Sequence, residues 1–162
     1  MNSREAEALL ASPTTDARIE FLNSLYYIAE SEKRLQSVDK SWDAMHRVLC
    51  GGWLDHKHGD ETLRACVIGG QQLSDNPSWI ISYVDLAMAK RIAPAIADIQ
   101  YGWFREQYFA LNRNPRGWFV HRYDYPMSEE DFEYTWEYFT FVQAFYRDAA
   151  HRNLSSVFAV DQ

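Results

Sequence analysis

The stretch that begins at Asp39 carries the residue types best suited to acid–base chemistry. Trp42 and His46 are four residues apart, so on a helix they lie one turn apart on the same face. A carboxylate at Asp39 could orient His46 as a general acid or base in a pocket lined by aromatic rings. The alternative is that Asp39 is a helix N-cap and His46 a core histidine satisfied by a backbone carbonyl. Since no nucleophile or second carboxylate accompanies the group, we favour the structural interpretation and assign no catalytic residue.

Residues 55–61 contain side chains of the kinds that bind metal ions. A His-x-His pair such as His56 and His58 can chelate zinc when it lies on a strand, and Cys50 or Cys66 could in principle contribute a thiolate. No further His or Cys pair at a fixed spacing supports these two histidines. We therefore predict a solvated loop, with no metal site and no cofactor.

Arginines alternate with aromatic rings and a second candidate pocket histidine between residues 105 and 123. Such interleaving can stack on bases and hold phosphates. The formal net charge of −7, however, repels nucleic acids and anionic membranes at long range. No run approaches the ~20 apolar residues of a membrane span. We expect no nucleic-acid or membrane partner, and we expect the arginines to pair with the acidic C-terminal helix. The residues concerned are Arg105, Arg113, Arg116, Trp118, His121, Arg122 and Tyr123.

The acidic residues are concentrated between residues 124 and 148, where Arg147 is the one basic residue. Those at 129–131 suit the start of a helix, where they complement the helix dipole. Glu133 and Glu137 have no cation one turn further on, so a solvated helix face explains them less well. An acidic face would steer a basic protein partner and raise its association rate. Both interpretations stay open, and the partner-binding candidates are Glu130, Glu133 and Glu137.

The longest element that must position these residues is a predicted helix from Ser128 to about residue 152. Ser128 is a typical N-cap, and rings recur along the helix in two stripes. A helix that is apolar over so wide an arc should pack on two sides, so we expect it to be the central helix of the core. One stripe comprises Phe132, Trp136, Phe139, Val142 and Tyr146, and the other Tyr134, Tyr138, Phe141 and Phe145.

The remaining pattern predicts an α+β fold: a predominantly helical single domain over residues 1–162 with a small sheet. Helical spacing covers residues 3–10, 15–29, 39–50, 86–99 and 101–111, with a break near Ala93 because proline follows it. Short strands are predicted over residues 79–83 and 156–160, and over 66–68, a run too brief to distinguish from helix. Two cysteines are too few for a disulfide framework, and no signal peptide is recognised. We therefore expect a cytoplasmic protein with free thiols.

Three stretches together resemble one known family. The sequence VDKSWDAMH at residues 38–46 is similar to the signature Leu-Asp-x-Asp-Lys-x-Trp-x-x-Leu-His of the YfbM-like family, a bacterial family of unknown function. The apolar run at 65–70, which ends in two glycines, and the region from Asp124 to the C-terminus are similar to later parts of that family. Members commonly begin with a strand, whereas this chain begins in a helical pattern. The resemblance implies an α+β fold with a small sheet over about residues 38–162, and no established activity.

Two functions of different classes follow. Members of that family resemble small cytoplasmic proteins found beside interbacterial toxins. The first expectation is therefore a non-catalytic binding protein, immunity- or antitoxin-like, whose acidic face neutralises a basic partner. The alternative is a small enzyme or ligand-binding protein that uses His46 or His121 in an aromatic-lined pocket, together with Asp39 and Trp42. The sequence predicts no oligomeric state.

Overall fold

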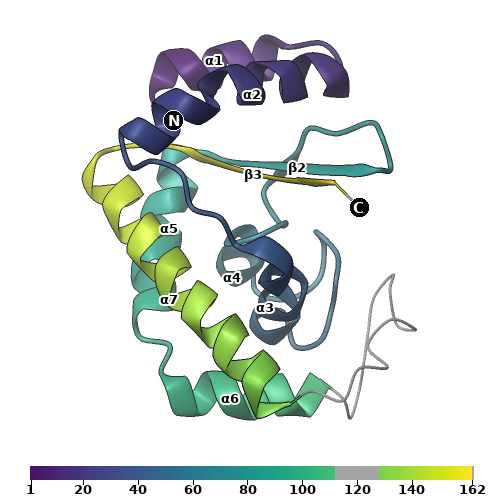
Figure 1. The fold of residues 1–162 in the computed structure, drawn as a ribbon, viewed down its shortest axis with the longest axis vertical. Coiled ribbons are helices and arrows are strands. Elements are labelled where there is room, and N and C mark those ends of the chain that lie inside the picture. Colours follow the sequence, from purple (N-terminus) through teal and green to yellow (C-terminus); the bar gives the residue numbers. More distant parts are fainter. Residues whose placement is uncertain (112–127, 162) are drawn as a thin grey trace.

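The computed structural model describes residues 1–111 and 128–161, in which helices lie on both faces of a three-stranded antiparallel sheet (Figure 1). This arrangement confirms the predicted α+β class, mainly helical with a small sheet and a long C-terminal helix. The helices are α1 (Ser3–Ala11), α2 (Thr15–Ser31), the 3₁₀ helix η1 (Asp39–Ser41), α3 (Trp42–Leu49), α4 (Glu61–Ala65), α5 (Leu86–Ala97), α6 (Tyr101–Ala110) and α7 (Glu129–His151). The strands are β1 (Gln71–Gln72), β2 (Trp79–Val84) and β3 (Ser156–Asp161).

The sheet has the order β1-β2-β3, so the C-terminal strand lies at one edge. Ile80 pairs with Val160 and Ile81 with Ala159. Because successive side chains of a strand point to opposite faces, the two pairs face different halves of the molecule. Figure 1 shows α1 and α2 over one face and the other helices below the opposite face.

Each face of the sheet closes a separate apolar cluster. The cluster under α1 and α2 is small and contains Ala6, Leu9, Leu73, Ile81 and Tyr83. The larger cluster joins the other face of the sheet to α3–α7. Its centre is aromatic: Phe104, Phe132 and Phe139 are fully buried, and the rings of Phe104 and Phe139 stack with centroids 4.6 Å apart. Aromatic pairs of this kind stabilise a core beyond the area they bury.

Helix α7 begins where the sequence predicts. The hydroxyl of Ser128 accepts from the backbone N–H of Asp131 at 3.0 Å, and the Asp131 carboxylate accepts in return from the backbone N–H of Ser128. The helix contacts α3, α5, α6 and η1. Its two ring stripes differ in burial, since the first faces the larger cluster and the second lies at its margin. Phe141, in the second stripe, is 40% exposed.

The apolar run at 66–68 is buried, as expected, but it is a turn and not a strand. The helix α4 directly precedes it, begun by Asp60, whose carboxylate accepts from the backbone N–H groups of Thr62 and Leu63. A three-residue apolar run has no period to separate strand from helix. The third strand of the sheet is instead β1, which lies in a segment with the composition of a loop.

Helix α5 continues through Pro94, so the predicted break near Ala93 is wrong. Ala89, Ile92 and Ile96 are fully buried, and α5 packs along α7. Burying these side chains offsets the hydrogen bond that proline removes, so the helix is kept intact by tertiary packing.

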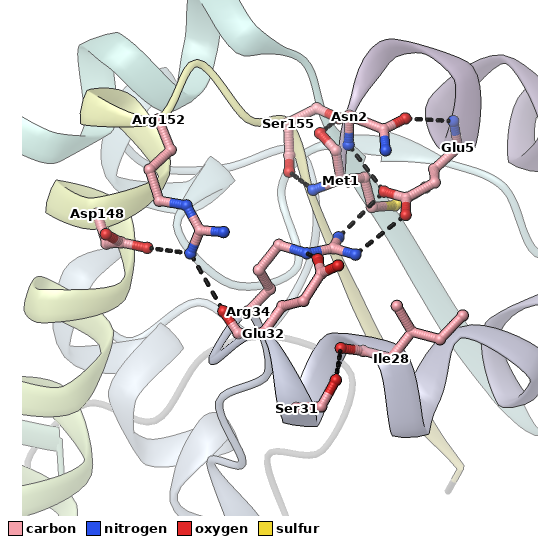
Figure 2. Close-up of polar contacts among 10 residues, drawn as sticks. All are labelled: Met1, Asn2, Glu5, Ile28, Ser31, Glu32, Arg34, Asp148, Arg152 and Ser155. Carbon is pink, nitrogen blue, oxygen red and sulfur yellow. Dashed lines mark hydrogen bonds and ion pairs between the residues drawn. The ribbon is translucent and has the colours of Figure 1, made fainter.

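Polar contacts around Arg34 join α1 to the end of α2, and the neighbouring Met1 joins α1 to the segment before β3 (Figure 2). The Arg34 guanidinium donates two hydrogen bonds of 3.0 Å to the carboxylate of Glu5 and one of 2.6 Å to Glu32. Next to this pair, the backbone N–H of Ser155 donates to the carbonyl of Met1 at 3.0 Å. The start of β3 is thereby fixed to the start of α1.

Candidate functional site

One side of α7 is a continuous exposed strip. Helical geometry places its members within an arc of about 80° and spreads them over about 27 Å. It contains four carboxylates, one phenyl ring, and no lysine or arginine. We call it the acidic strip. Its residues are Glu130, Glu133, Glu137, Phe141, Ala144 and Asp148, all exposed.

The carboxylates of the acidic strip are unequally engaged. Tyr101 donates its hydroxyl hydrogen bond to Glu133, which raises the pKa of Tyr101. Asp148 forms an ion pair of 3.0 Å with Arg152. No hydrogen bond or ion pair links the carboxylates of Glu130 and Glu137 to a residue within 1–111 or 128–161. Both side chains are exposed.

One arginine of the aromatic-rich segment pairs with the acidic helix, as expected. Arg105 forms an ion pair with Glu129, which lies beside the acidic strip. The other arginines of that segment and His121 lie outside the described residues. The three predicted partner-binding glutamates are thus not those that Arg105 neutralises.

His46 is enclosed in the core. Its Nε2 lies 2.9 Å from the carbonyl oxygen of Asp55 and therefore carries the proton that it donates. Its Nδ1 lies 3.9 Å from the Sγ of Cys50. Burial lowers the pKa of His46 to about 4, so the ring is neutral near pH 7. This is the arrangement of a core histidine satisfied by a backbone carbonyl.

Asp39 does not orient His46. Its backbone has a φ of 42°, in the left-handed region, and it lies in η1, so the predicted N-cap of the following helix is wrong. The Asp39 carboxylate instead accepts a hydrogen bond of 2.6 Å from the hydroxyl of Tyr134 on α7. Trp42 is half-buried, with its ring 5.9 Å from that of Phe158. The chain thus brings Asp39 and Trp42 to α7 and β3, away from the imidazole.

Asp39 and Trp42 line a groove of about 500 Å³ that follows the whole of β3. We call it the β3 groove. One wall is α2, the other is residues 34–39 with Trp42, and Trp79 and Phe145 complete the lining. The sequence pattern gave no indication of this groove, because its lining comes from segments far apart in the chain.

The histidines at 56 and 58 belong to a tightly bonded loop. The Asp55 carboxylate accepts from the backbone N–H of Lys57 at 2.7 Å and from the Nδ1 of His58 at 2.8 Å. The His58 ring stacks on Trp53 at 4.1 Å. Burial would raise the pKa of Asp55, but these hydrogen bonds outweigh it and lower that pKa. Within the described ranges, no group of three or more His, Cys, Asp and Glu side chains is placed to hold a metal ion.

Both cysteines are free thiols in the core. Burial raises the pKa of Cys50 to about 12, and it raises the pKa of Cys66 as well. Neither is a reactive thiolate near neutral pH.

The family model described as "Domain of unknown function (DUF1877)" matches residues 1–159. The chain belongs to this family. The DUF1877 match includes α1 and α2, which lie before the motif at 38–46. A search of curated proteins and a search of solved structures each gave no match. In the described part of this DUF1877 chain, every helix is too short or too polar to cross a membrane.

Three members of the acidic strip, Phe141, Ala144 and Asp148, were not among the sequence candidates. Phe141 and Asp148 follow Glu137 at spacings of 4 and 11, and both spacings return to nearly the same side of a helix. Phe141 also belongs to the second ring stripe, and Asp148 lies more than two helical turns after Glu137, so neither residue stands out in the local sequence. A helical wheel centred on Glu130 would have grouped both with the three glutamates.

Proposed function

We propose that this DUF1877 chain is a non-catalytic binding protein that recognises a basic protein partner through the acidic strip. In this proposal the chain covers its partner as an immunity protein or antitoxin covers a toxin. The observation that carries it is the exposed line of carboxylates at Glu130, Glu133 and Glu137 with Phe141 in the same line. Charge speeds the encounter with a basic surface, and an exposed ring supplies the apolar anchor that interfaces commonly use.

The similarity of residues 38–46 to the YfbM-like signature supports this function by analogy alone. It also supports placing the chain in a YfbM-like branch of DUF1877 and in the cytoplasm. In the structure that motif forms η1 and α3, whose Asp39 bonds α7. Its role there is to hold the helix that carries the acidic strip.

The test is charge reversal on the acidic strip. Proteins that copurify with the chain would be identified, purified and measured for direct binding by surface plasmon resonance. The triple variant E130K/E133K/E137K should weaken binding by about a hundredfold or more, mainly through a slower association rate, and should flatten its salt dependence. Phe141→Ala should instead raise the dissociation rate with the salt dependence unchanged.

A matched control is available on α1 and α2. The variant E7K/E20K/E30K changes the net charge by the same amount at three exposed glutamates outside the acidic strip. It should keep most of the affinity. Equal losses in the two triple variants would mean that net charge alone governs binding, and unchanged affinity in the first would remove the acidic strip from consideration.

The alternative function, an enzyme or ligand-binding protein that uses a histidine in an aromatic-lined pocket, finds no support at His46. The His46 ring is completely buried and its Nε2 is occupied by the Asp55 carbonyl. His121 lies outside the described residues, so its part in the alternative stays a prediction. Asp39 and Trp42 line the aromatic β3 groove, and no histidine of residues 1–111 or 128–161 lines it.

A further inference from the structure

The outer edge of β3 is unpaired in the sheet, and it has no part in the proposed binding through the acidic strip. β3 pairs with β2 along its entire length, and no strand of the described chain lies on its other side. An edge strand presents a row of unpaired backbone N–H and C=O groups, which can pair with another chain.

The hydrogen-bond pattern identifies which groups of β3 face outward. The Leu73 N–H donates to the Ile81 carbonyl, so the backbone groups of Ile81 point to β1, away from β3. In the register of the sheet, Ile81 is opposite Ala159, so the Ala159 groups also point away from their partner strand. Ser155 agrees, because its N–H donates to Met1 outside the sheet. By alternation, the outward N–H and C=O groups belong to Val157, Ala159 and Asp161.

Those outward groups have no backbone partner among the residues that the structure describes. Met1 bonds Ser155, the residue directly before β3, as Figure 2 shows. Past that point the edge is the floor of the β3 groove, which every residue of β3 lines. The unpaired backbone groups of β3 therefore lie within the β3 groove.

Both walls of the β3 groove contribute apolar side chains, and the wall at residues 34–39 also contributes the polar side chains of Arg34, Gln36, Ser37 and Asp39. On the α2 side the groove is lined by Leu22, Leu25 and Tyr26, and Tyr26 is 46% exposed. On the opposite side it is lined by Trp42 and Phe145, next to β3. A strand laid along β3 would meet apolar surface on both of its faces. A strand buried on both faces is usually a nearly continuous apolar run.

We propose that the β3 groove binds an extended, apolar peptide segment of a partner protein, which adds a fourth strand to the sheet beside β3. Main-chain hydrogen bonds to Val157 and Ala159 supply the affinity, and the apolar side chains of the two walls select the side chains of the segment. The exposed carboxylates of Asp39 and Asp161, both in the lining, favour lysine or arginine in the segment. A second copy of the chain fits less well, because the recessed edge of one copy would meet the projecting α2 and residues 34–39 of the other.

The probe is the acetylated and amidated peptide Lys-Val-Thr-Ile-Val-Thr-Ile-Lys, titrated into the full chain and followed by NMR. The Val157 and Ala159 amide protons should exchange fast in the free protein, and binding should slow their exchange. Ala159→Pro removes one outward N–H and leaves the groups that pair with β2 in place, since proline is tolerated on an edge. It should weaken binding at least about tenfold. Ala159→Ser keeps the N–H and should bind like the wild-type chain.

A second arm leaves the protein unchanged. Two versions of the peptide carry N-methyl groups, one on the odd-numbered amides and the other on the even-numbered amides. Because alternate amides of a strand point to opposite sides, only one version has its β3-facing amides blocked. One version should lose binding and the other should keep it. The proposal is overturned if both bind alike, if the parent peptide does not bind at about 1 mM, or if Val157 and Ala159 are already protected in a dimer that sedimentation detects.

Discussion

His46 makes the stability of the fold depend on pH. Its pKa is lowered by burial to about 4, below the value of 6.5 expected in the unfolded chain. Between these two values the unfolded state binds the proton and the folded state does not, so stability falls as the pH falls through this window. From pH 7.5 to pH 5 the loss assigned to His46 is about 2 kcal/mol. Urea denaturation at the two pH values measures it.

The matched variant is His46→Gln, whose amide can still donate to the Asp55 carbonyl. It should be less stable than wild type at pH 7.5, because a smaller side chain fills the site less well, but its further loss at pH 5 should be smaller by that same ~2 kcal/mol. The pKa of Asp55 is also lowered, so protonation of Asp55 at low pH reduces the stability of the fold as well. This reduction is the same in the wild-type protein and in the variant. Equal pH dependence in the two would contradict the assignment.

At the scale of the residue, the spacing in the sequence correctly predicted that His46 is buried, but it wrongly predicted that Asp39 caps the helix of His46. The one-turn spacing of Trp42 and His46 correctly indicated a shared helix. The direction of the Asp39 side chain depends on a left-handed backbone conformation, which the neighbouring residue types do not indicate. Its partner, Tyr134, is 95 residues away. A contact over that distance is decided by packing, which local spacing does not record.

At the scale of the element, two prolines should respond oppositely to the same substitution. Pro94 lies within α5, where it removes a helical hydrogen bond. Pro94→Ala should raise the free energy of unfolding by about 1–2 kcal/mol, since alanine restores that bond and the loss of a rigid residue from the unfolded chain offsets only part of it. Chemical denaturation at pH 7.5 measures the change.

Pro77 is the matched control. It follows Asn76 in a turn closed by a hydrogen bond of 3.1 Å from the Trp79 N–H to the Asn76 carbonyl, a position that suits proline. Pro77→Ala should lower stability by about 0.4–1 kcal/mol, because the unfolded chain gains freedom and no bond is regained. Should Pro94→Ala also destabilise the protein, a bend at Pro94 would be required for α5 to pack on α7.

Elements with a strong local signal were predicted well. The helical spacing at residues 15–29 locates α2, the cap at Ser128 starts α7, and the apolar run at residues 157–160 forms β3. The errors occur where packing outweighs local preference, as in α5, or where a run is too short to show a period, as at residues 66–68. The pairing that creates β1 depends on contacts with β2 and not on the two glutamines that form it.

At the scale of the whole molecule, the two halves on either side of the sheet differ in how firmly they are held. Thr15 is the one fully buried residue of α2, whereas Tyr27 on the same helix is 77% exposed. The small cluster beneath α1 and α2 offers little apolar area, so polar contacts must supply more of the attachment. The sequence contains the charges of that attachment, but their pairing follows from the path of residues 32–38 and could not be predicted from spacing.

Arg34 joins α1 to the end of α2, and its removal should loosen α1 and α2 before the rest of the fold. Its side chain is 7% exposed, and that of Glu5 is 15% exposed. Burial would raise the pKa of Glu5, but the hydrogen bonds from Asn2 and Arg34 lower it, so Glu5 is charged at neutral pH. Arg34→Ala leaves this carboxylate enclosed without its partner and should cost about 2 kcal/mol or more. Amide exchange should rise in α1 and α2 at denaturant concentrations where α5 and α7 stay protected.

The pair Arg91–Glu61 provides the comparison, because it has the same 3.0 Å separation but both side chains are more than half exposed. Arg91→Ala should therefore cost less than about 0.5 kcal/mol and leave exchange in α1 and α2 unchanged. Arg34→Lys, which keeps the charge but loses the two-pronged geometry, should fall between these variants. If Arg34→Ala instead lowered protection uniformly in all helices, the two faces of the sheet would unfold as one unit. The α2 wall of the β3 groove would then be as rigid as the core beneath it.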